Sequence, residues 1–170
     1  MKWKKEVISL LENELQKDEI WKDIFIESQK RNNSIHLAVF AEPFLSLILN
    51  GKKTIESRFS KNNISPFNKI NRGDLVVLKK SGGNITGVFQ SGKILNQRNL
   101  NSNLLNDLES KYGEKICSGI DPDFWKDRKD KNYATLIWVN KFKSISPFRI
   151  NKKDRRGWVV LNEKKESILF

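Results

Sequence analysis

Lysine, glutamate and arginine side chains that could bind phosphate or transfer protons lie close together in one octet, Gly51-Lys52-Lys53-Thr54-Ile55-Glu56-Ser57-Arg58. Lysine and arginine bind phosphate groups, and a neighbouring carboxylate can orient an arginine or accept a hydrogen bond from a base. The same residue types can provide general acid–base catalysis and stabilise a developing negative charge. The octet therefore predicts a binding or catalytic site.

Two elements are expected to position this octet. An apolar helical run over residues 43–49 precedes it, and Gly51 stands where a glycine commonly ends a helix, because glycine adopts the left-handed conformation without a Cβ clash. Residues 54–59 then alternate as a strand does, which places alternate side chains on the same face. Thr54, Glu56 and Arg58 share one face, and we expect Lys53, Glu56 and Arg58 to form a polar cluster at the corner between helix and strand.

Length and composition favour one domain of ordinary size with an appendage, since the 170 residues are 38% hydrophobic and 10% aromatic. No apolar run approaches the roughly 18–20 residues of a membrane span, and the N-terminus lacks a signal-peptide pattern. We therefore expect a cytoplasmic protein without a membrane partner. Cys117 is the one cysteine and His36 the one histidine, which argues against a disulfide, a zinc site or a histidine-based triad. No metal and no cofactor are expected, and His36 is expected to be structural or exposed.

The positive charge is concentrated around and beyond the octet. The net charge is +12, yet residues 1–50 contain 7 basic and 8 acidic side chains, whereas residues 51–100 contain 10 and 2. Concentrated positive charge attracts polyanions, so nucleic acid is the favoured partner and a solubilising lysine-rich surface is the alternative. The basic turn with Arg155 and Arg156 could extend a phosphate track, and Trp125 could stack on a base, although a solvated turn and core packing are equally good interpretations.

Hydrophobic patterning predicts an α+β fold. Residues 3–31 show a helical apolar stripe, with Asp18 placed to cap a second helix. Short strands are expected at 35–40, 75–78, 85–95, 133–142 and 158–161, and further helices at 104–112 and from Asp121. Strands without βαβ alternation predict a mixed or antiparallel β-barrel with short flanking helices and an N-terminal helical extension.

The octet resembles the G-x-K-x-x-E-x-R signature of the ASCH domain family, a PUA-like β-barrel group linked with RNA, and Gly51, Lys53, Glu56 and Arg58 meet its four positions. The family places this signature after a short helix that begins with proline, as Pro43 does here, and Phe124-Trp125 followed by a Tyr133-led strand also fits. The resemblance implies an N-terminal helical extension at 1–34, an ASCH barrel at 35–162 and a tail at 163–170.

The resemblance implies an RNA or a nucleotide-like ligand in a basic cleft at the signature. The residues expected to bind it are Lys52, Lys53, Thr54, Glu56, Arg58, Trp125, Arg155 and Arg156.

Two other classes of function remain open. Some small ASCH proteins hydrolyse N4-acetylcytidine with a signature lysine, a threonine three residues later and a distant glutamate. In this sequence Lys53 matches the lysine, and Glu114 is the best match to the distant glutamate. The threonine position is occupied by Glu56. A metal-independent ribonuclease, an activity also associated with ASCH proteins, could use the group Lys53, Glu56 and Arg58. Alternatively, the N-terminal helices could dock a protein partner or form a homodimer, which would require an exposed apolar stripe on residues 7–25.

Overall fold

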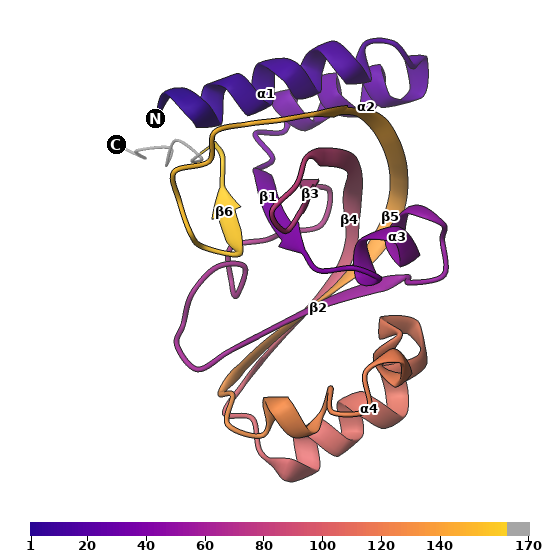
Figure 1. Cartoon of the computed structure of the whole chain (residues 1–170), viewed down its shortest axis with the longest axis vertical. Helices are drawn as coiled ribbons and strands as arrows, with labels where there is room; N and C mark the ends of the chain where they lie inside the picture. Colours follow the sequence, from indigo (N-terminus) through magenta and orange to yellow (C-terminus); the bar gives the residue numbers. More distant parts are fainter. Residues whose placement is uncertain (163–170) are drawn as a thin grey trace.

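The computed structural model describes residues 1–162, so the expected tail at 163–170 lies outside the described residues. The chain forms a curled half-barrel sheet with the two N-terminal helices at one end and the helix α4 (Ser102–Ile116) at the other (Figure 1). The strands are β1 (Ile35–Phe40), β2 (Ile55–Ser60), β3 (Leu75–Lys80), β4 (Ile85–Arg98), β5 (Tyr133–Phe148) and β6 (Trp158–Val160). This arrangement confirms the predicted α+β class and barrel-like sheet.

The six strands follow the order β2-β5-β4-β3-β1-β6. The pair β1–β3 is parallel, and the other four pairs are antiparallel, as the sequence predicted for a mixed sheet. β2 and β6 stand at the two ends of this order, so the sheet has two open edges within residues 1–162. The octet occupies one of these edges.

A long β4–β5 ribbon joins the two parts of the molecule (Figure 1). Its register shifts beside Gly87 and again between Ser91 and Ile94. A Cβ atom at Gly87 would lie 2.7 Å from Leu49 Cδ2. Glycine is favoured at this position because the helix that contains Leu49 approaches the strand too closely for a side chain. The predicted end of β5 was too early, since the strand continues beyond Phe142 to Phe148. Pro147 does not end it, because this proline lies in an irregular stretch between two paired positions.

The N-terminal helices α1 (Lys2–Leu15) and α2 (Glu19–Lys30) pack on the upper part of the sheet. Asp18 caps α2 as predicted, because its carboxylate accepts a hydrogen bond from the Trp21 amide at 3.2 Å. The apolar stripe shares one core cluster with strand residues such as Leu37 and Val77. The sheet therefore covers the face that a docking surface on these helices would have needed.

The short helix α3 (Phe44–Leu49) and the helix α4 (Ser102–Ile116) differ from the sequence expectation in detail. α3 begins at Phe44, with Pro43 as its N-cap, and Leu45 and Ile48 are its buried residues. The α4 helix continues past Tyr112 and Gly113, and it ends at Cys117 in the left-handed conformation (φ 63°). The helix expected from Asp121 is a single 3₁₀ turn at Lys126–Arg128, which follows another at Ser118–Ile120. Within residues 1–162, no helix is long and apolar enough to cross a bilayer.

Replacing Leu11 by alanine tests whether the helical pair belongs to the core. Leu11 is fully buried between α1 and the sheet, so Leu11→Ala is expected to lower the free energy of unfolding by about 2–5 kcal/mol in urea denaturation. The matched control is Glu12→Ala at the neighbouring exposed position, with an expected change below about 0.5 kcal/mol. Equal effects of the two substitutions would show that the helices are a peripheral appendage.

Candidate ligand-binding cleft

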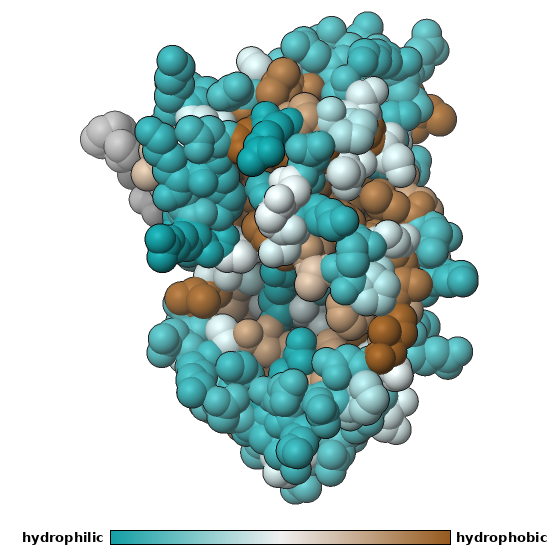
Figure 2. Space-filling model, in the orientation of Figure 1, coloured by the Kyte–Doolittle hydropathy of each residue, from teal (hydrophilic) through white to brown (hydrophobic). Residues whose placement is uncertain are grey.

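A cavity of about 390 Å³ lies where β2 passes the end of β1, the α3 helix and the Lys126–Arg128 turn. Figure 2 shows the surface hollowed between the part that carries α1 and α2 and the part that carries α4. We call this cavity the signature cleft. Its charged and aromatic lining consists of Lys53, Arg58, Arg128, Lys131, Glu56, Asp127, Phe40, Phe44, Phe59 and Phe124.

Lys53 is almost completely buried at the signature cleft, with 3% of its surface exposed. Its ammonium donates to the Ile116 carbonyl oxygen at 2.7 Å and lies 3.9 Å from Glu56 Oε1. Burial lowers the pKa of Lys53, and the nearby Glu56 carboxylate opposes this shift. The side chain therefore connects β2 to the end of α4 while remaining at the cleft wall.

Glu56 lies between two cations without bonding directly to either. Its Oε1 accepts the Ser57 amide at 2.6 Å, and its Oε2 lies 3.9 Å from an Arg58 nitrogen. The distance to the Lys53 ammonium is also 3.9 Å, and both separations are too long for a direct hydrogen bond. Glu56 thus neutralises charge at close range but leaves donor capacity on both cations.

Arg58 connects the two open edges of the sheet. Its guanidinium donates to the Val39 carbonyl oxygen at 2.9 Å and to the Gly157 carbonyl oxygen at 3.4 Å. It also lies over the rings of Phe40 and Trp158, at 4.7 and 5.2 Å from their centroids. Burial lowers the pKa of Arg58, and Glu56 opposes this effect. Carbonyl oxygens and aromatic faces therefore hold the cation in place while Glu56 partly balances its charge.

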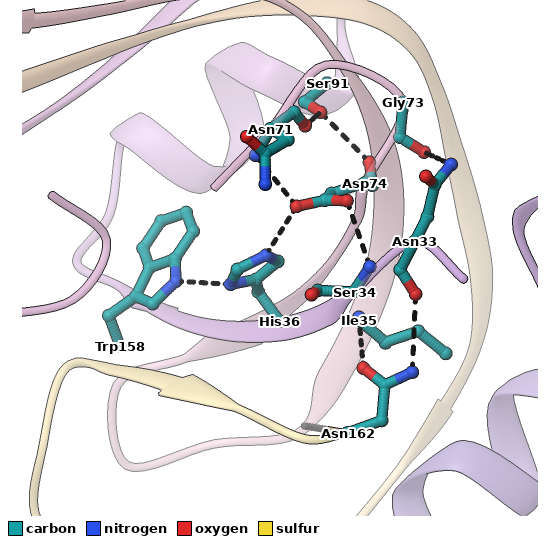
Figure 3. Close-up of polar contacts among 10 residues, drawn as sticks. All are labelled: Asn33, Ser34, Ile35, His36, Asn71, Gly73, Asp74, Ser91, Trp158 and Asn162. Carbon is teal, nitrogen blue, oxygen red and sulfur yellow. Dashed lines mark hydrogen bonds and ion pairs between the residues drawn. The ribbon is translucent and has the colours of Figure 1, made fainter. Parts of the chain in front are cut away.

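Trp158 is itself fixed by a buried polar network (Figure 3). Its indole N–H donates to His36 Nδ1 at 3.0 Å, and His36 Nε2 lies 3.0 Å from Asp74 Oδ2. An indole nitrogen can only donate, so Nδ1 accepts and the proton of the neutral imidazole lies on Nε2. Asp74 also accepts the Ser34 amide at 3.0 Å. His36 is therefore structural, and it orients the ring that supports Arg58.

Arg128 is a cleft residue that the sequence analysis missed, because residues 126–131 had the charge density of a solvated loop. Its guanidinium lies 3.5 Å from the centroid of the Phe124 ring and donates to the Phe124 carbonyl oxygen at 2.7 Å. Its Nε is buried and has no hydrogen-bond partner among the described residues. Burial lowers the pKa of Arg128 as well. The one available signal was its spacing, one helical turn after an aromatic residue.

The remaining predicted site residues lie elsewhere. Thr54 is exposed and does not line the signature cleft, and Lys52 and Glu114 line a separate cavity beside Cys117. Trp125 packs edge-on against Phe59 and Phe124, at centroid distances of 5.9 and 5.0 Å, behind the cleft wall. Arg155 and Arg156 are exposed outside the cleft, and Arg156 pairs with Asp154. Of the predicted residues, the structure brings together Lys53, Glu56 and Arg58.

A curled mixed sheet with a charged cleft beside its edge strand defines a PUA-like barrel domain. The model of the ASCH domain family matches residues 39–146, and the chain therefore belongs to this family. Among solved structures, the ASCH protein of Zymomonas mobilis is similar at 16% identity and a TM-score of 0.59, over 76% of this chain and 88% of that one. A serine-to-alanine mutant of that protein is similar at 15% identity and a TM-score of 0.60, over 78% of this chain and 92% of the mutant chain. No curated protein sequence matches the chain.

The burial of Lys53 predicts an unusual pH dependence of stability. Since its folded pKa lies below the ordinary value of 10.5, the unfolded chain holds more protons between these two pH values. Stability contributed by Lys53 therefore rises as pH increases through this window. Urea denaturation across alkaline pH should show this rise in the wild type and in Lys22→Met, an exposed control, and a smaller rise in Lys53→Met. Identical profiles for the two variants would contradict the expectation.

Removing the indole N–H of Trp158 tests the buried network. Trp158→Phe keeps an aromatic face for Arg58 but leaves the His36 Nδ1 acceptor unpaired. Trp3→Phe is a matched control, because the buried Trp3 indole nitrogen has no hydrogen-bond partner. Trp158→Phe is expected to lower the free energy of unfolding by about 1–3 kcal/mol more than Trp3→Phe does. Equal losses in urea denaturation would show that the His36–Trp158 bond adds no stability.

Proposed function

We propose that the protein binds single-stranded RNA, or a nucleotide-like ligand, in the signature cleft. The observation that carries this proposal is the excess of desolvated positive charge around Glu56. Burial lowers the pKa of Lys53, Arg58 and Arg128, and all three line one cavity with this carboxylate. With Lys131 and Asp127 included, the lining has four basic and two acidic side chains. A bound anion would balance the remainder.

The unused donors indicate how a phosphate would be held. The Nε of Arg128 is buried without a partner among residues 1–162, and a buried unpaired donor costs about 1–3 kcal/mol until an acceptor satisfies it. Lys53 and Arg58 keep donor capacity because Glu56 lies 3.9 Å from each of them. A phosphate oxygen among these three cations would accept charge-assisted hydrogen bonds, which are stronger than neutral ones.

Aromatic side chains supply the second half of nucleotide recognition. Phe44, Phe59 and Phe124 line the cleft, and the ring centroid of Phe124 lies 6.4 Å from that of Phe44 and 6.2 Å from that of Phe59. Stacking on such rings and phosphate contacts to basic residues are the usual combination in single-stranded recognition. Glu56 can accept a hydrogen bond from an exocyclic amine of a base. The net charge of +12 further favours a polyanion.

A metal-independent hydrolase acting on RNA or a modified nucleoside is the second candidate. Its support is the lowered pKa of Lys53 beside Glu56, which favours the neutral amine that a general base requires. The Ser57 residue also lines the cleft. An N4-acetylcytidine amidohydrolase is less well supported, because Glu56 occupies the threonine position and Glu114 lies at another cavity.

The test is binding of short fluorescent single-stranded RNAs at two salt concentrations, with gel analysis of the same samples for cleavage. Lys53→Met retains the bulk of the side chain but removes its charge, and it should weaken binding about 10-fold or more and reduce the salt slope by about 0.7. Lys22→Met, at an exposed position on α2, is the control for net charge. Cleavage that disappears in Lys53→Met would assign the hydrolase instead. Equal binding by both variants would overturn the proposal.

A further inference from the structure

A second basic cavity, which we call the upper groove, lies far along the chain from the signature octet. It has a volume of about 720 Å³ and is lined by α1, the β3–β4 turn and the segment after β5. Its charged residues are Lys79, Arg149 and Lys152, against the single carboxylate of Glu6. Gly82 in the turn has a φ of +68°, and a Cβ there would meet nothing within 4 Å, so a ligand can approach this backbone closely.

A short segment joins the upper groove to the signature cleft. We call residues 149–157 the basic strap; they run from beneath α1 to the lower end of β6 (Figure 1). Lys152 Nζ donates to the Arg156 carbonyl oxygen at 2.8 Å, and the Gly157 carbonyl oxygen accepts from Arg58 at 3.4 Å. Five residue steps separate Lys152 from Gly157, so this stretch spans at most about 18 Å. The strap therefore links a residue of the upper groove, Lys152, to a backbone group in contact with Arg58 of the signature cleft.

The strap has a large excess of positive charge. Its basic residues are Arg149, Lys152, Lys153, Arg155 and Arg156, and Asp154 is its one acidic residue. Arg156 binds the Asp154 carboxylate through Nε at 2.9 Å and holds the pKa of Asp154 well below its usual range. This pairing offsets the charge of Arg156, and the Lys152 ammonium is bonded to backbone carbonyls of the strap. The exposed basic side chains of the strap besides Arg156 are therefore Arg149, Lys153 and Arg155. Figure 2 shows hydrophilic side chains gathered over the strap, beside the hollow.

We propose that the upper groove and the basic strap bind the phosphates that flank the nucleotide in the signature cleft, so that the RNA ligand is an extended single strand. This inference rests on the proposed function and specifies its substrate class. A mononucleotide needs only the signature cleft, whereas a strand of several nucleotides would also reach the basic strap and the upper groove, which contains Arg149. Basic grooves that track the backbone are typical of single-strand binding, with sites of about 4–16 nucleotides per domain in proteins of other folds.

The experiment compares a labelled RNA of about ten nucleotides with a labelled dinucleotide at several salt concentrations. The test variant is Lys79→Gln with Arg149→Gln, which removes two groove charges. The control is Lys22→Gln with Lys30→Gln, two exposed lysines of α2, which changes the net charge equally. The groove variant should weaken binding of the longer RNA about 10-fold and lower its salt slope by about 1.4, with dinucleotide binding unchanged. The control variant should not weaken the binding of either RNA by a comparable factor.

The outcomes separate this inference from the proposed function. Equal weakening by the groove and control variants would overturn the inference, since only net charge would matter. If the dinucleotide binds in a Lys53-dependent way but the longer RNA binds no more tightly, the signature cleft is the whole site. The inference then fails while the proposed function stands. If neither RNA binds to the wild-type protein, the further inference and the proposed function both fail.

Discussion

The structure depends on the guanidinium of Arg58, which spans two strand edges that do not pair with each other. β2 and β6 are the ends of the sheet order, and Arg58 on β2 donates to the carbonyl oxygens of Val39 and Gly157. Burying this cation is costly, and Glu56, two carbonyl oxygens and two aromatic faces offset the cost. A lysine could not reproduce these contacts, because its single ammonium lacks the planar fork of donors. The same side chain therefore maintains the fold and charges the signature cleft.

Lys53 also connects two elements of the structure, at another part of the cleft wall. Its bond to the Ile116 carbonyl oxygen fastens the end of α4 to the beginning of β2. Removing one partner of a buried charge cluster is expensive because it leaves the others uncompensated. Here Glu56 is the one carboxylate that partly balances both Lys53 and Arg58, so the cluster keeps a positive excess without a ligand. The structural role of these cations and their proposed role in anion binding follow from the same desolvation.

Local rules predicted the features that depend on neighbouring residues. Gly51 ends α3 with a φ of +80°, Asp18 caps α2, and strand alternation brings Glu56 and Arg58 to one face. Features that depend on distant packing were not predictable. The place of Arg128 in the cleft follows from its packing on Phe124 and Phe59, and residue 59 lies on a strand about 70 residues earlier. Glu114 was assigned by its type alone, and its helix carries it to another cavity.

The sheet stays open beside the signature cleft, because β2 and β6 do not pair with each other. Arg58 from β2 instead donates to the carbonyl oxygens of Val39, near the end of β1, and Gly157, just before β6. Its guanidinium also lies over Trp158, whose indole N–H is bonded to His36 and, through His36, to Asp74. The buried network contacts no ligand itself. It fixes the ring over which Arg58 lies, and a cation held in one position would favour the proposed ligand binding.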